Sequence, residues 1–164
     1  MTALNKRFTR CVLTAMILCF GLLKLGISQG QALNPALSLP PSDLAPAVYF
    51  VNLKDGDKLR SPFRVVFGLS RLGLAPAGVD LPVTGHHHLL INTPLPRDLT
   101  KPIPFSDKYR HFGGGQSEAV LELAPGKHTL QLLFADHKHR PFVKAKSGED
   151  VVVFSKQITI EVLQ

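Results

Sequence analysis

The sequence of 164 residues contains no tryptophan, and it has only two cysteines and two methionines. Both cysteines and the one internal methionine fall early in the chain, at Cys11, Met16 and Cys19. A domain folded from the rest of the chain therefore has no disulfide, so an apolar core must hold it together. Such a domain also offers no thiolate or thioether to a soft metal ion such as Cu(I).

Acidic residues are absent from the first 32 positions, where an apolar run over residues 11–23 follows a basic start. This run is shorter than the roughly 20 apolar residues that a membrane span needs. Together with the small residues of Gly30-Gln31-Ala32, it predicts a secretory signal peptide over residues 1–32. We expect cleavage, and an uncleaved N-terminal anchor is the alternative. Both predict a periplasmic or otherwise exported domain with no further membrane contact. The basic residues of this segment are Lys6, Arg7, Arg10 and Lys24.

The positive charge of the chain is concentrated in this segment. The whole chain carries +7, but without those four residues 15 basic residues face 12 acidic ones, a net charge of +3. A nucleic-acid-binding domain would show a basic stripe with interleaved aromatic residues, and none is present. We therefore expect no nucleic-acid partner.

The segment 33–46 is predicted to be a linker, because its four prolines prevent a regular element. Residues 47–164 show no apolar repeat of period 3.6, but they contain short alternating or apolar runs between Gly and Pro turns. This pattern predicts an all-β domain, an immunoglobulin-like two-sheet antiparallel sandwich of about seven strands, with a small barrel as the alternative. The expected strands are 47–53, 63–70, 86–92, 108–112, 117–123, 127–135 and 151–163.

All the histidines lie in the second half of the chain, and all are candidate metal ligands. Neutral imidazole suits Zn and Cu(II). The sequence has no His-Glu-x-x-His helix and no cysteine pair, so no specific zinc motif supports the assignment. The candidates are His86, His87, His88, His111, His128, His137 and His139.

Strand alternation gives the first three histidines directions, because successive side chains point to opposite faces. Leu89 and Ile91 form the better core pair of strand 86–92, which turns His87 inward. His86 and His88 then share the opposite face, where two histidines two residues apart can chelate a metal.

The later histidines give two further indications. His128 stands at the end of the core-facing row of strand 127–135, beside a turn. For His87 and His128 the alternative to metal binding is a half-buried histidine that hydrogen-bonds a backbone carbonyl and fixes a loop. The segment Asp136-His137-Lys138-His139 repeats the spacing of the His86 and His88 pair beside a carboxylate. Loops at one end of a sandwich cluster, which would bring the two pairs together.

Catalytic motifs are lacking. No serine sits in a nucleophile elbow. Gly113-Gly114-Gly115 does not join a strand to a helix, so we interpret it as a flexible turn and not as a phosphate-binding loop.

Three motifs in order resemble a family of small exported bacterial domains, the domain-of-unknown-function family numbered 4399. The resemblance spans residues 48–162 and implies an exported β-domain without implying an activity. It also implies histidines at His87, His88, His111, His128 and His139. A second family histidine near Tyr109 is replaced here by Lys108-Tyr109-Arg110, so no ligand is implied there. The motifs are Gly85-His86-His87-His88-Leu89-Leu90-Ile91, His111-Phe112-Gly113-Gly114-Gly115-Gln116-Ser117-Glu118 and Pro125-Gly126-Lys127-His128-Thr129-Leu130-Gln131-Leu132.

We therefore expect a binding module and not an enzyme. The leading hypothesis is that a subset of His88, His111, His128 and His139 binds Cu(II) or Zn for metal buffering or delivery in the periplasm. The alternative is a structural or interaction domain that contacts an envelope protein or glycan, with its histidines in structural hydrogen bonds. A hydrolase is a third class, and it would need a pocket with a perturbed carboxylate or a metal-bound water.

Overall fold

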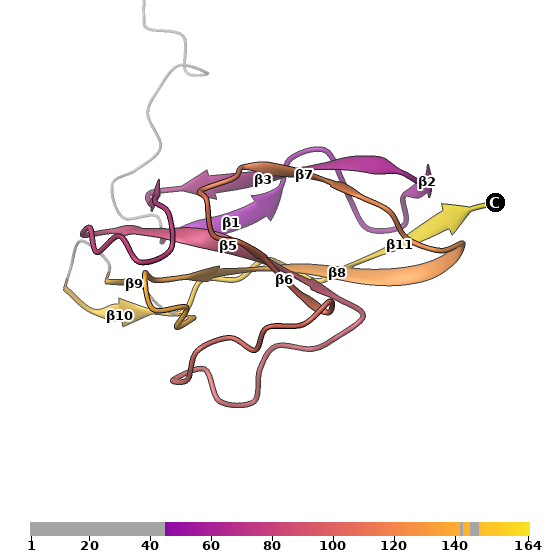
Figure 1. Cartoon of the computed structure of the whole chain (residues 1–164). Helices are drawn as coiled ribbons and strands as arrows, with labels where there is room; N and C mark the ends of the chain where they lie inside the picture. The colour runs from indigo at the N-terminus through magenta and orange to yellow at the C-terminus, as the bar shows by residue number, and fades with distance from the viewer. Residues whose placement is uncertain (1–44, 142, 145–147) are drawn as a thin grey trace, which may run out of the picture. The chain divides into compact units, whose positions relative to one another are not determined.

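The computed structural model describes residues 45–141, 143–144 and 148–164 (Figure 1). The predicted signal peptide and all of the predicted linker up to residue 44 lie outside these residues. The described part is all-β, as predicted, and it holds no helix that is long and apolar enough to cross a membrane. Its strands are β1 (Ala47–Phe50), β2 (Lys58–Arg60), β3 (Phe63–Ser70), β4 (Gly73–Leu74), β5 (Thr84–Ile91), β6 (Tyr109–Phe112), β7 (Glu118–Leu121), β8 (Gly126–Ala135), β9 (Val143–Lys144), β10 (Asp150–Val151) and β11 (Ile158–Leu163).

The strands form a β-sandwich, which confirms the predicted architecture. A three-stranded sheet has the order β1-β3-β7, and a six-stranded sheet has the order β2-β11-β8-β5-β4 with β6 also paired to β5. A two-stranded ladder of β9 and β10 is separate from both.

The strand count and direction differ from the prediction in two respects. The described residues form eleven strands where about seven were expected, and β2–β11 and β4–β5 are parallel pairs in a sandwich expected to be antiparallel. The additional strands β2, β4, β9 and β10 have only two or three residues, so they carry no readable alternation. The predicted strand 151–163 is interrupted between β10 and β11, where Phe154 forms only an isolated bridge to Leu133.

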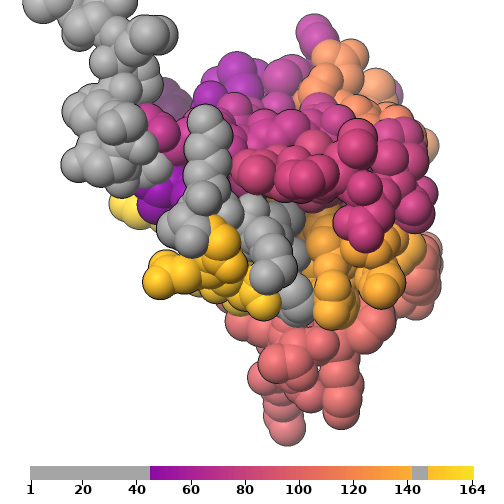
Figure 2. All heavy atoms as spheres, turned by 90° about the vertical axis from the view of Figure 1, so that its left-hand side faces the viewer, coloured from indigo at the N-terminus to yellow at the C-terminus, as the bar shows by residue number. Residues whose placement is uncertain are grey.

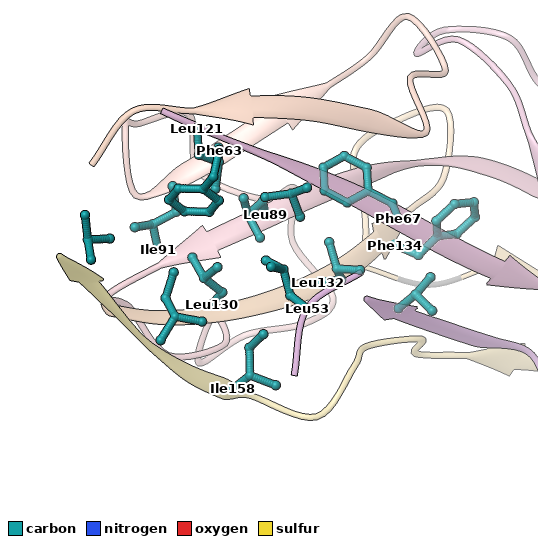
Figure 3. Close-up of a cluster of buried hydrophobic side chains, with 14 of the residues drawn as sticks. Leu53, Phe63, Phe67, Leu89, Ile91, Leu121, Leu130, Leu132, Phe134 and Ile158 are labelled. Atoms are coloured by element: carbon teal, nitrogen blue, oxygen red, sulfur yellow. The ribbon is translucent and has the colours of Figure 1, made fainter. Parts of the chain in front are cut away.

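The main core lies between the two larger sheets (Figure 3). On β3 the buried residues Phe63, Val65 and Phe67 alternate with Arg64, which is exposed, as the sequence predicts. Alternate residues of β5, β8 and β11 in the six-stranded sheet pack against them. Each fully buried side chain of this size contributes roughly 1.5–3 kcal/mol, so the core can stabilise the domain without a disulfide. The facing residues are Leu89, Ile91, Leu130, Leu132, Phe134, Ile158, Ile160 and Val162.

Part of the outer face of the six-stranded sheet, over β5 and the second half of β8, is buried as well. Leu90, Leu133 and Ala135 form a second cluster with Ile103, which comes from the proline-rich segment between β5 and β6. Leu133 alternates with the core-facing residues Leu132 and Phe134 of β8 and so lies on the face away from the main core, yet its side chain is fully buried. The reason is that residues 93–108 fold back across this face, which a strand pattern does not reveal.

One edge of β5 is shared by two strands. β4 pairs with Thr84 and Gly85, and β6 pairs with the four residues from His87 to Leu90. His86 therefore lies between the ends of β4 and β6. At Gly85 the backbone of β8 approaches so closely that a Cβ atom would lie 2.1 Å from the carbonyl oxygen of Ala135. This position therefore accepts only glycine. The close approach fixes the register of β5 against β8 at the residue before His86.

Candidate metal centre

Four histidines meet on the outer face of the six-stranded sheet. His86 and His88 come from β5, His111 from β6, and His139 from the loop after β8. The ring centroids of all six pairs lie between 4.8 and 6.0 Å apart. We call these four residues the histidine cluster.

Strand register explains why three of the four converge. His88 stands directly opposite His111 in the antiparallel pairing of β5 and β6, so the two side chains share a face. His86 lies on the same face, because it is two residues from His88. Its partner on β8 is Ala135, the last residue of that strand. The loop that carries His139 therefore begins beside His86.

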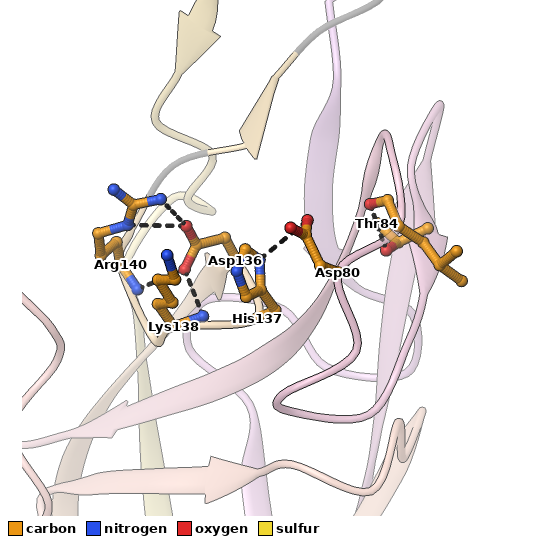
Figure 4. A network of polar contacts seen from close by, with 7 residues as sticks. Asp80, Thr84, Asp136, His137, Lys138 and Arg140 are labelled. Carbon is orange, nitrogen blue, oxygen red and sulfur yellow. Dashed lines mark hydrogen bonds and ion pairs between the residues drawn. The ribbon is translucent and has the colours of Figure 1, made fainter.

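A buried carboxylate shapes that loop (Figure 4). Asp136 accepts hydrogen bonds from the backbone N–H groups of Lys138 and Arg140 at 2.8 and 2.9 Å, and from Arg140 Nε at 2.8 Å. Burial alone would raise the pKa of Asp136, but these bonds outweigh it and the pKa falls. The loop turns at His139, where φ is +63°, and the carbonyl of His139 accepts a hydrogen bond from the N–H of Ile103 at 2.8 Å.

The glycine turn after β6 holds His111 in place. A Cβ atom on Gly113 would lie 2.1 Å from Cε1 and 2.3 Å from Nε2 of the His111 ring. The ring therefore occupies space that any other residue at position 113 would fill. The predicted flexible turn thus has a second role, since it leaves room for a histidine of the cluster.

The nitrogen atoms in the cluster are close enough to share one ion. Nε2 of His86 lies 3.2 Å from Nε2 of His88, and Nε2 of His111 lies 3.1 Å from Nε2 of His139. One ligand atom from each of His86, His111 and His139 lies within 4.8 Å of the others. A tetrahedral ion with metal–nitrogen bonds of 2.0–2.1 Å separates its ligand nitrogens by about 3.3 Å. The spacing fits a metal centre after small movements of the rings.

Burial keeps the inner rings neutral. Burial first, and then the neighbouring His111 and His139, lower the pKa of His86 to about 4. Burial first, and then the neighbouring histidines, lower the pKa of His88 to about 2. Burial and then His139 also lower the pKa of His111. Only a neutral imidazole can bind a metal, so these rings need not lose a proton to do so at neutral pH.

Two nitrogen atoms of the inner rings have no partner in the described part of the chain. Nδ1 of His86 and Nδ1 of His88 are buried and make no hydrogen bond there. Buried polar atoms in proteins are nearly always paired, and unpaired ones often mark a missing ion or water. Unpaired nitrogen atoms of this kind each cost about 1–3 kcal/mol in a folded protein.

His87 points into the core, as the alternation of β5 predicts. Its ring lies between Phe67 and Phe134, with centroids 5.2 and 5.3 Å away. The expected half-buried position and carbonyl hydrogen bond are wrong, because the residue is fully buried and neither ring nitrogen has a partner among the described residues. Burial lowers the pKa of His87 to about 4. The two neighbouring rings, those of Phe67 and Phe134, carry no hydrogen-bond acceptor.

The structure does not bring His128 to the cluster. Its Nε2 donates to the carbonyl of Ala124 at 2.8 Å, and its Nδ1 accepts from the side-chain amide of Asn92 at 2.9 Å. Asn92 in turn accepts from the N–H of Thr129 at 2.9 Å. This is the loop-fixing role that the sequence offers as the alternative to metal binding.

His137 also points away from the cluster, toward a pocket of about 460 Å³. Its Nδ1 lies 3.3 Å from a carboxylate oxygen of Asp80. Figure 2 shows this side of the molecule, where the segment before β5 (magenta) lies beside the loop after β8 (orange). The two loop histidines therefore have different neighbours: His137 lies beside Asp80, and His139 belongs to the histidine cluster.

Sequence reasoning missed one contributor to the site. His86 was among the candidate ligands and was placed on one face with His88, although the preferred subset of four histidines left it out. Phe105 carried no signal, because it lies in the proline-rich segment, yet its ring contacts both His111 and His139.

The comparison with models of protein families gives a match. The model of a protein family described as "Domain of unknown function (DUF4399)" matches residues 65–163, which is more than half of the chain. The matched range includes all seven histidines. Among curated proteins none matches this sequence.

Proposed function

We propose a function from the histidine cluster itself, because this chain belongs to the DUF4399 family, whose description assigns no activity. The protein binds one divalent transition-metal ion, Zn or Cu(II), through His86, His111 and His139. His88 lies against His86 and supplies a fourth imidazole.

The observation that carries the proposal is the convergence of four imidazoles from three separate segments. A half-buried structural histidine needs one or two polar partners, as His128 has. In the cluster, two buried ring nitrogens lack any partner among the described residues. Those atoms are Nδ1, whereas the atoms that approach one another are Nε2, so a shared ion would bind at Nε2 and the proposal stands on that convergence.

The ligand chemistry favours Zn or Cu(II). The cluster offers only imidazole nitrogen, which suits borderline metals, whereas Ca²⁺ and Mg²⁺ prefer oxygen ligands. Residues 45–164 contain no cysteine or methionine that would select Cu(I).

We infer a role in metal buffering or delivery outside the cytoplasm, and not in catalysis. The signal-like N-terminal sequence supports the location. Asp136 is the carboxylate whose charge acts to raise the pKa of His86. Its two oxygens already accept hydrogen bonds from Lys138 and Arg140. It is therefore poorly placed to serve as a general base beside the metal.

The test is a titration of the purified protein, without a histidine tag, with Zn and Cu(II) against a chromophoric chelator. We expect one ion per chain, and we expect His86→Ala or His111→Ala to weaken binding by more than about 100-fold. His128→Ala is the matched control, because His128 lies outside the cluster, and it should bind as the unmodified protein does.

Binding weaker than roughly micromolar, about −8 kcal/mol, would contradict the proposal. Equal losses in His86→Ala and His128→Ala would also contradict it. The alternative, an envelope interaction domain with structural histidines, predicts no metal uptake in the same titration.

A further inference from the structure

Phe105 is the most exposed large hydrophobic residue of the described chain, with 69% of its surface accessible. Its ring nevertheless has two neighbours. The centroid lies 5.3 Å from that of His111 and 5.2 Å from that of His139, at interplanar angles of 79° and 62°. The ring therefore contacts two imidazoles by its edge and faces solvent on its other side. It lies between solvent and the partly exposed histidines of the cluster.

The backbone on both sides of Phe105 is fixed. Ile103 is 2% exposed within the second cluster, and its N–H donates to the carbonyl of His139. Ser106 accepts a hydrogen bond from the N–H of Tyr109 at 3.0 Å, which begins β6. Pro104 restricts the backbone between them. The position of the ring is therefore set by the same segments that carry two of the ligands.

The histidines of the cluster become more exposed to solvent toward the Phe105 ring. His86 and His88 are 0% and 1% exposed, whereas His111 and His139 are partly exposed. The two outer histidines are the ones that Phe105 contacts. An ion that reaches His86 from solvent must therefore pass the outer histidines and the ring above them.

Resting on the proposed metal site, we propose that Phe105 is a positioning residue that closes this site and sets the rate of metal exchange. Its ring excludes water from the outer ligands, and release of an ion requires water or a competing ligand to replace those imidazoles. The apolar surroundings of a metal centre control solvent access in this way.

The test measures metal release from the loaded protein after it is mixed with excess chelator in a stopped-flow instrument. Phe105→Ala should release the metal about tenfold faster or more, and Phe105→Tyr, which keeps the ring, should stay near the unmodified rate. Phe154→Ala is the matched control, because Phe154 is 48% exposed and makes no ring contact with a histidine of the described chain. The unfolding midpoint of the metal-free protein should be nearly the same in all variants.

A release rate in Phe105→Ala within about twofold of the unmodified rate overturns this inference while leaving the metal site intact. An equal acceleration in Phe154→Ala overturns it too, because the effect would then be general. If the unmodified protein binds no metal, the proposed function itself fails, and that result is separate from the other two.

Discussion

Replacing His87 by leucine should stabilise the protein. The imidazole is fully buried against Phe67 and Phe134, and in the part of the chain that the structure describes neither ring nitrogen has a partner. Leucine fills a similar space with apolar atoms. A buried polar group without a partner costs about 1–3 kcal/mol, and the substitution removes that cost.

The gain should grow as the pH falls. Burial lowers the pKa of His87 from 6.5 to about 4 in the folded protein. Below pH 6.5 the unfolded chain takes up a proton that the folded protein refuses, so unfolding becomes easier as the pH falls toward 4. Over this range the single group removes about 3 kcal/mol of stability. The pKa values of His86 and His88 are lowered as well, so the His87→Leu variant retains part of the pH dependence of the unmodified protein.

The assay is urea unfolding followed by circular dichroism at about pH 7.5 and about pH 5, with a chelator present to exclude metal effects. His87→Leu should have the higher unfolding free energy at both pH values, with the larger difference at the lower one. A lower unfolding free energy at both pH values would refute the reasoning. So would an equal gain at both, because the ring would then not resist protonation.

Three further substitutions test the frame around the cluster. His128→Leu should lower the unfolding free energy by about 1–2 kcal/mol in the same urea assay, because it removes two hydrogen bonds, and it should leave metal affinity unchanged. Gly113→Ala should weaken metal binding in the chelator titration, because its Cβ would displace the His111 ring, whereas Gly114→Ala meets only a flexible side chain at 3.1 Å and should bind normally. Asp136→Asn should lower the unfolding free energy by about 2–4 kcal/mol and weaken metal binding, since it loosens the loop that carries His139, and an unchanged titration would contradict that role.

The faces of the long strands could be predicted from the sequence, because alternation is a local property. The inward direction of His87 and the shared face of His86 and His88 follow from counting residues along β5. The fate of His87 could not be predicted, because the number of its partners depends on what covers the strand. Phe67 and Phe134 close that side, and neither is near His87 in the sequence.

The membership of the cluster depends on pairings between distant parts of the chain. His88 meets His111 only because β5 and β6 pair in one register across the proline-rich segment. His139 joins them because Asp136 fixes the loop after β8. His128 was a candidate ligand because of its place on a strand. It lies outside the cluster, because its end of β8 faces Asn92 and not β6.

The proposed ligands His86, His111 and His139 come from segments far apart in the chain, and the last two are 28 residues apart. An ion held by all three would join these segments as a cross-link, in a domain that has no cysteine to form one. Cross-links that close loops of this length remove conformational freedom from the unfolded chain. Unlike a disulfide, this cross-link would need no oxidant and would open whenever the ion is taken by a stronger ligand. The folded domain would then be tightest while it carries its cargo and looser once it has given the cargo up.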